Sequence, residues 1–172
     1  MQAIVAVSQN WGIGHRGDLL FHIKPDLQFF RDTTRGKVIV MGRTTLDSLP
    51  GTKLLSERIP FVLTRDKALS REGVTFCHSV EELLEKLAAY PSEDIFSIGG
   101  GEIYRLLLPW CDSALVTRVE ASSSADAFFP NLDEERGWVL EERGERQEYE
   151  GLGYAFCRYR NTEALPITQL KG

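Results

Sequence analysis

The chain has 172 residues, which fits one domain, because domains commonly run to about 150 residues. Hydrophobic residues make up 42% of it and charged residues 26%, as is typical of a folded globular chain. These values exclude a disordered protein, and no apolar run approaches the roughly 18 residues that a membrane-spanning helix needs. The start, MQAIVAVSQNWGIG, lacks the features of a signal peptide. We therefore expect a cytoplasmic protein with Cys77, Cys111 and Cys157 as reduced thiols.

The net charge of −5 is unevenly spread, because residues 1–71 carry eleven Lys or Arg but only six Asp or Glu. A nucleic-acid-binding protein needs a broad basic face, so we expect no nucleic-acid partner. A cationic first half would suit a small anionic ligand. Scattered surface charges would give the same count and remain the alternative.

In chain order, short apolar runs predict six buried strands, at 3–7, 37–41, 59–64, 74–77, 95–98 and 114–120. A glycine-rich loop (11–23) follows the first strand, and Pro25 opens a helix that ends at Gly36. Further helices are expected from Gly42 to Pro50-Gly51, after the capping serine Ser79, and from Gly101 to Pro109. Strands at 138–141 and 154–160, with no helix between them, predict an antiparallel pair.

Alternation of strands and helices predicts an α/β fold in a single domain, residues 1–160, followed by a poorly ordered tail, 161–172. Its mostly parallel central sheet would have about eight strands, helices on both faces and an antiparallel C-terminal edge strand. Ligands bind such sheets outside the carboxyl ends of the strands.

Asp26 is the most informative acidic residue. It lies one helical turn from Phe30, so we expect both to face an apolar groove under the glycine-rich loop. A carboxyl group there would have a raised pKa or need a hydrogen-bonding partner, and would be a candidate proton donor. The alternative is an exposed acid that favours the dipole of the helix.

Glycines and arginines follow several predicted strands. The run 99–101 could expose backbone N–H groups to a pyrophosphate, or could simply permit close packing of helix on sheet. Arg43 and Arg65 could bind a phosphate, or could be solvated; Arg58 could bind a carboxylate, or lie on the surface. The three histidines lack metal-binding spacing, so we expect no metal site.

Several blocks, in this order, resemble dihydrofolate reductase of the bacterial chromosomal type: AIVAVSQNWGIG, LLFHIKPDLQFFRDTT, VIVMGRTTLDSLPG, IPFVLTR, IFSIGGGEIY and LVTRVEASSSADAFFP. The resemblance covers residues 1 to about 160. It implies NADPH-dependent reduction of 7,8-dihydrofolate to 5,6,7,8-tetrahydrofolate, by hydride transfer to C6 and protonation of N5. It also implies that the protein acts in one-carbon metabolism and that antifolate drugs would bind it. A monomer is the default, with a small folate as substrate and no membrane partner.

The resemblance also implies the roles of individual residues. Asp26 would be the catalytic acid and Thr117 its supporting hydroxyl. The substrate would contact Val5, Leu27, Phe30, Leu49, Leu55, Arg58 and Ile98. The cofactor NADPH would contact Ala6, Ile13, Gly14, Gly42, Arg43, Thr44, Thr45, Thr64, Arg65, Gly100, Gly101, Ile103 and Tyr104, and residues 11–23 would form a mobile loop over the nicotinamide.

Two stretches depart from the family pattern. Leu20 and Phe21 stand where the family usually has proline and tryptophan, and PGTKLLSERIP is longer than usual, so the positions of Leu55 and Arg58 could slip. Two other functions remain open. One is the related pyrimidine reductase of riboflavin synthesis, whose substrate would need a phosphate clamp in place of Phe30. The other is a non-catalytic nucleotide-binding module.

Overall fold

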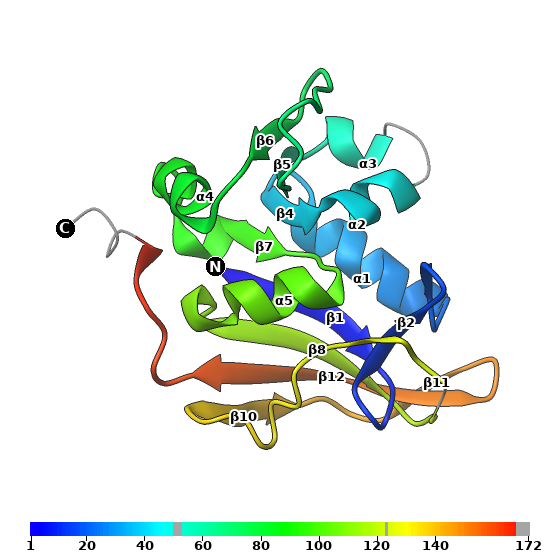
Figure 1. Ribbon diagram of the computed structural model, residues 1–172. Coiled ribbons are helices and arrows are strands. Elements are labelled where there is room, and N and C mark those ends of the chain that lie inside the picture. Colours follow the sequence, from blue (N-terminus) through cyan, green and yellow to red (C-terminus); the bar gives the residue numbers. More distant parts are fainter. Residues whose placement is uncertain (50–52, 123, 168–172) are drawn as a thin grey trace.

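The computed structural model describes residues 1–49, 53–122 and 124–167 (Figure 1). A nine-stranded mixed sheet forms its centre. Eight strands follow one another in the order β10 (Trp138–Arg143), β12 (Leu152–Asn161), β8 (Ser113–Val119), β1 (Gln2–Val7), β7 (Ile95–Ser97), β4 (Val38–Gly42), β5 (Ile59–Leu63) and β6 (Thr75–Cys77), and β11 (Gln147–Tyr149) pairs with β12.

Neighbouring strands from β8 to β6 run parallel, while β12 is antiparallel to β8, β10 and β11. The predicted fold class and the antiparallel pairing of the last strands are therefore confirmed. No helix lies between β10 and β12 in the chain, so the two strands can pair antiparallel without a crossover connection.

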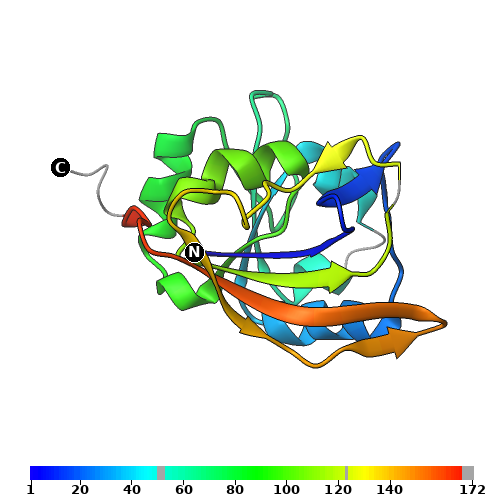
Figure 2. The same cartoon turned by 90° about the horizontal axis from the view of Figure 1, so that it is seen from below.

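Helices cover both faces of this sheet (Figure 2). One face carries α4 (Val80–Leu87) and α5 (Gly101–Leu107); the other carries α1 (Lys24–Thr34), α2 (Arg43–Ser48) and α3 (Lys53–Ser56). The short turn η1 (Ser92–Asp94) precedes β7, and η2 (Leu108–Trp110) follows α5. Alternation along β4 explains the two layers, because neighbouring side chains of a strand point to opposite faces. Val40 packs in the core with α4 and α5, whereas Met41 packs with Leu46 of α2.

A small second sheet was missed by the sequence prediction. The glycine-rich loop contains the strands β2 (Gly12–His15) and β3 (Asp18–Leu19), and β2 also pairs with β9 (Ala127–Phe128). These strands have two to four residues and depend on backbone pairing between distant segments, so no hydrophobic period marks them. We call residues 12–19 the β2–β3 hairpin.

Other boundaries differ in detail. The helix α1 begins at Lys24, one residue before Pro25, and α3 was not predicted. The helix predicted to stop at Pro109 instead ends at Leu107 and continues as the 3₁₀ turn η2, which contains Pro109. The predicted helix end at 50–51 lies outside the described residues.

The first part of the predicted tail lies against the domain. The amide of Leu165 donates to the carbonyl of Pro109 at 2.9 Å, and Ile167 packs on the main core. Residues 168–172 lie outside the described part of the chain. Among the described helices, none has the length and apolar character to cross a membrane.

Candidate active site

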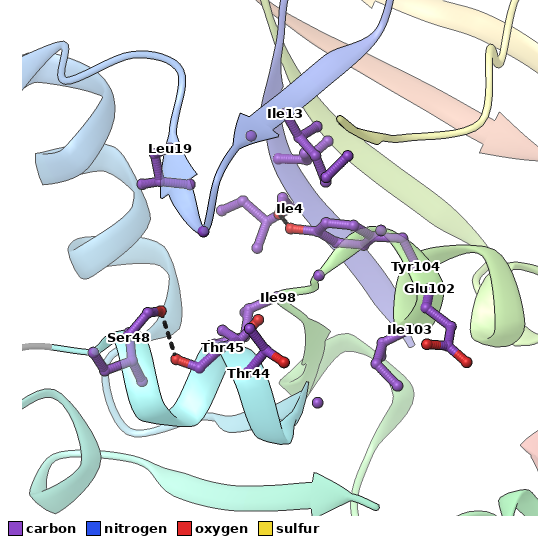
Figure 3. Close-up of a pocket in the computed structure, with 18 of the residues that line it drawn as sticks. Ile4, Ile13, Leu19, Thr44, Thr45, Ser48, Ile98, Glu102, Ile103 and Tyr104 are labelled. Atoms are coloured by element: carbon purple, nitrogen blue, oxygen red, sulfur yellow. Dashed lines mark hydrogen bonds between the residues drawn. The ribbon is translucent and has the colours of Figure 1, made fainter. Parts of the chain in front are cut away.

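One large cavity, of about 1690 Å³, opens at the carboxyl ends of the parallel strands. Its walls come from the ends of β1, β4 and β5, from α1 and α2, from the start of α5 and from the β2–β3 hairpin. Figure 3 shows how the hairpin residues Ile13 and Leu19 lie across the cavity from Thr45 and Ser48 of α2. The site is therefore where the sheet topology predicts a ligand.

Most of the residues named from the sequence line this cavity. They are Val5, Ala6, Ile13, Gly14, Asp26, Leu27, Phe30, Gly42, Arg43, Thr44, Thr45, Leu49, Arg58, Thr64, Arg65, Ile98, Gly100, Gly101, Ile103 and Tyr104. Leu55 is not among them. It is buried with Met41 and Leu46 under α2, so its packing is that of a core residue. The roles of these residues remain predictions.

Asp26 is a shielded carboxyl group on the cavity side of α1. The hydroxyl of Thr117 on β8 donates a hydrogen bond to its Oδ1 at 2.6 Å. Burial raises the pKa of Asp26, and the hydrogen bond from Thr117 opposes part of that rise. Thr117 is buried and is not among the residues that line the cavity; it contacts Asp26 directly from β8. A carboxyl group whose pKa is raised in this way, at the wall of a cavity, is a candidate for proton exchange with a ligand.

A contact on a neighbouring side of α1 explains why Asp26 faces inward. Phe29 packs on Phe156 of β12, with ring centroids 4.7 Å apart, and so fixes the rotation of the helix. Residues 26, 27 and 30 then share the cavity side, with apolar Leu27 and Phe30 beside the acid.

Arg58 is buried, which excludes the surface alternative. Its Nε donates to Oγ1 of Thr34 at 2.8 Å, and its Nη2 donates to the carbonyl of Arg31 at the same distance. Burial lowers the pKa of Arg58 below its ordinary value, and the carboxylate of Glu57 opposes that shift. The guanidinium is thus held in a fixed orientation where it lines the cavity.

Two arginines at the ends of β4 and β5 are exposed. Arg43 pairs with Asp47 at 3.5 Å and with Asp66 at 3.3 Å, so neither contact is short. Within the described ranges, Arg65 makes no ion pair. An anionic ligand could therefore approach both exposed side chains, and at Arg43 it would compete with the two carboxylates.

The glycines divide between the two uses that the sequence left open. A Cβ on Gly42 would come within 2.9 Å of Ile103, and one on Gly101 within 2.8 Å of the carbonyl oxygen of Phe128. These two glycines serve close packing. A Cβ on Gly100 would have only Thr45 Oγ1 nearby, at 3.7 Å, so this backbone is open to the cavity.

Tyr104 closes the back of this region (Figure 3). Its buried hydroxyl donates to the carbonyl of Ile4 at 2.7 Å, which ties α5 to the central strand. Burial raises the pKa of Tyr104 far above its ordinary value, so the hydroxyl remains protonated and keeps this bond.

Sequence reasoning missed several cavity residues. They include Arg31, Arg35 and His78, whereas Leu19, Leu20 and Phe21 belong to the loop 11–23 that was expected over the nicotinamide. Arg31 and Arg35 are one turn apart on α1, and that spacing could have placed both beside Arg58. Only the fold reveals that His78 approaches the site, where its Nδ1 lies 3.0 Å from the carbonyl oxygen of Thr64. The described residues contain no group of three or more His, Cys, Asp or Glu able to hold a metal ion.

Comparisons with known proteins agree with this geometry. A family model described as dihydrofolate reductase matches residues 1–161. A dihydrofolate reductase of Neisseria meningitidis serogroup A is 35% identical over 157 residues, covering 91% of this chain and 94% of the relative. One of Staphylococcus haemolyticus is 31% identical, covering 91% of this chain and 92% of the relative.

Longer relatives share only this region. A bifunctional dihydrofolate reductase-thymidylate synthase of Glycine max is 38% identical over 149 residues, which are 77% of this chain and 28% of the relative. The chain thus spans less than a third of the length of such relatives. The match over nearly the whole sequence nevertheless decides the family: the chain belongs to the dihydrofolate reductase family.

Proposed function

We propose that this protein reduces 7,8-dihydrofolate to 5,6,7,8-tetrahydrofolate with NADPH. One observation carries the proposal: a shielded carboxyl group with a raised pKa, Asp26, lies in a cavity that also presents a buried arginine, Arg58, and two exposed ones. This arrangement suits a ligand pair that needs one proton and carries several negative charges. We also propose that the protein acts as a cytoplasmic monomer, and that residues 1–160 form the catalytic domain.

The residues present fit the cofactor. Gly100 leaves backbone exposed to the cavity, as a pyrophosphate requires for close approach. A 2′-phosphate would bind Arg65 and would compete with Asp47 and Asp66 for the exposed guanidinium of Arg43. The nicotinamide side would be held by Ala6, Ile13 and Thr45. When bound, NADPH supplies the hydride.

Asp26 would hold the amino group and ring nitrogen of the pterin and promote protonation of N5. Its raised pKa suits that task, because a carboxyl group that holds its proton more strongly is more often in the protonated form that can donate it. Thr117 would keep the carboxyl group oriented through its 2.6 Å hydrogen bond. The proton ends on N5 while C6 gains the hydride, so the imine bond of the substrate is reduced.

The apolar walls and Arg58 would bind the rest of the substrate. Leu27, Phe30 and Leu49 would enclose the aminobenzoyl ring, and Arg58 would bind the α-carboxylate of the glutamate. The hydrogen bonds to Thr34 and Arg31 fix the guanidinium before substrate arrives, which lowers the entropy lost on binding.

The loss of NADPH absorbance on addition of dihydrofolate tests the proposal. We expect steady turnover with NADPH and much slower turnover with NADH. A parallel reaction with the ribosylaminopyrimidine phosphate of riboflavin synthesis should show none. Turnover only of that second substrate, or binding of NADPH without any turnover, would contradict the proposal.

A further inference from the structure

Polar and aromatic side chains form a cluster around Trp11, which precedes the β2–β3 hairpin and does not itself line the cavity. We call it the Trp11 cluster; its other members are Arg118, Phe129, Asp133 and Tyr159. The indole is 4% exposed and follows β1 immediately before the β2–β3 hairpin begins. Its ring stacks on Phe129 at a centroid distance of 6.3 Å and meets the edge of Tyr159 at 5.9 Å. The guanidinium of Arg118 lies 4.5 Å from the centre of the indole.

Arg118 is held in this place by two partners. Its Nη1 donates to the hydroxyl of Tyr159 at 2.8 Å and to Oδ2 of Asp133 at 3.1 Å. The hydroxyl of Tyr159 in turn donates to Oδ1 of Asp133 at 2.8 Å. Burial and this bond to Asp133 raise the pKa of Tyr159 to about 12, so the hydroxyl stays protonated at neutral pH. The three groups form a closed hydrogen-bonded triangle against the indole.

The backbone of Trp11 needs such support. Its φ angle is +62°, in the left-handed region that bulky side chains seldom adopt. A residue keeps such a conformation only where its surroundings determine it strongly. The carbonyl of Trp11 accepts from the amide of Phe129 at 2.9 Å, and its amide donates to the carbonyl of Ser8 at 3.0 Å.

The cluster is connected to the cavity through three elements. Gly12, next to Trp11, begins β2, whose Ile13 and Gly14 line the cavity. Gly12 is paired with Phe128 of β9, next to Phe129. Phe129 also meets the ring of the cavity residue Tyr104, at 4.9 Å. The indole is therefore joined to the hairpin that lines the cavity both through the backbone and through the paired strand β9.

We propose that Arg118 is a positioning residue for the cavity: by holding the Trp11 indole, it fixes where the β2–β3 hairpin lies over the ligands. Arg118 itself does not line the cavity. It acts on the end of the ligand that the hairpin contacts. Under the proposed function, on which this second step rests, that end is the nicotinamide.

The test compares three variants. Arg118→Met keeps the length of the side chain but loses its charge, and Arg118→Lys restores the charge. The matched control, Arg160→Met, removes a more exposed ion pair, with Glu141 at 3.4 Å, from the neighbouring strand β12. The first readout is amide hydrogen exchange of the unliganded protein.

For Arg118→Met, we expect exchange at residues 12–15 to rise roughly three- to thirtyfold, the range that corresponds to loss of one cation–π contact. Exchange in β4 should stay unchanged. Arg118→Lys should restore most of the protection, and Arg160→Met should match wild type at residues 12–15. Unchanged exchange at these residues, or an equal rise throughout the sheet, would overturn the proposal, because Arg118 would then have no local role.

The second readout is binding of NADPH and of adenosine 2′,5′-bisphosphate, which lacks the nicotinamide. Arg118→Met should weaken NADPH binding by a similar factor, leave the bisphosphate unaffected and leave the KM for dihydrofolate unchanged. Equal weakening of both ligands would overturn the nicotinamide step. Failure of the wild type to bind NADPH would count against the proposed function, and the exchange result would still decide the positioning role of Arg118.

Discussion

Asp26 and the pair Arg43 and Arg65 are charged in the same cavity but are held in opposite ways. Asp26 contacts β8, while Arg43 and Arg65 follow β4 and β5. In the sheet, three other strands separate β8 from β5. The acid is shielded from water and has one short hydrogen bond. The arginines are exposed and have long ion pairs or, among the described residues, none.

This difference separates two uses of charge. Shielding changes the chemistry of the group itself, because the pKa follows from desolvation and salt hardly reaches it. Exposed arginines contribute little to stability, and their positive charge favours ligands that carry negative charge. Changes at Asp26 should therefore alter the rate and its pH dependence, while changes at the arginines should alter the choice of cofactor and depend on salt.

The largest effect is expected for Asp26→Asn. Asparagine has almost the same shape and can still accept the hydrogen bond from Thr117, so the fold should survive. It cannot ionise, and we expect kcat/KM at neutral pH to fall by roughly 10²–10⁴-fold. The control is Glu102→Gln, an exposed acid that lines the same cavity, which should keep most of the activity. Equal losses in the two variants would show that shielding gives Asp26 no special role.

The next effect is expected for the double variant Arg43→Ala/Arg65→Ala. Each charged hydrogen bond contributes on the order of 1.5–3 kcal/mol, so most of the preference for NADPH over NADH should disappear. Turnover with NADH should change little, which makes NADH the internal control. The preference of the wild type should also weaken as salt is raised. A double variant that still discriminates would remove both arginines from the 2′-phosphate site.

A smaller and more selective effect is expected for Arg58→Ala. Binding of folates that carry a glutamate should weaken, and binding of a small antifolate without that carboxylate should barely change. Because the substitution also leaves Thr34 and the carbonyl of Arg31 without this donor, Arg58→Lys is the second variant. Lysine keeps the charge but not the planar fork, so we expect intermediate binding. Equal losses for both ligands would indicate a purely structural arginine.

The smallest effect concerns stability. A carboxyl group whose pKa is raised by folding stabilises the protein fully below its unfolded pKa, and this contribution is lost as pH rises through the folded pKa. Asp26→Asn removes the ionisation. We therefore expect its Tm to exceed that of the wild type at neutral pH, and the difference to shrink as pH falls toward about 4. Thermal melts across this range measure it, and a Tm difference that is independent of pH would contradict the raised pKa.

The sequence predicted the structure correctly where a pattern of nearby residues determines it. Apolar runs located the central strands, such as β4, and the spacing of Asp26 and Phe30 predicted which side of α1 lines the cavity. The β2–β9 pairing has no such signal, because it joins two short segments that are far apart in the sequence, with Gly12 paired to Phe128 and Gly14 to Ala127. The support of Asp26 by Thr117 is likewise non-local and came only from the family resemblance.

The burial of individual side chains could not be predicted from the sequence either. Arg58 and Leu55 stand near each other in the sequence, yet the structure makes one a buried arginine that lines the cavity and the other a core residue. Both residues belong to the run PGTKLLSERIP, which is longer than the family pattern. The Trp11 cluster also had no sequence signal, since Arg118, Asp133 and Tyr159 come from separate segments.

The pH dependence of the hydride step tests the central claim most directly. It is measured in single turnovers of wild type and Asp26→Asn, with melts to establish folding. If Asp26 promotes protonation of N5, hydride transfer in the variant should be slow at neutral pH. Its rate should rise steadily as the pH is lowered, because acid then protonates the free substrate. The wild type should transfer hydride rapidly at neutral pH without this help. A folded variant with wild-type rates at neutral pH, or one inactive at every pH, would contradict a role of Asp26 in proton transfer.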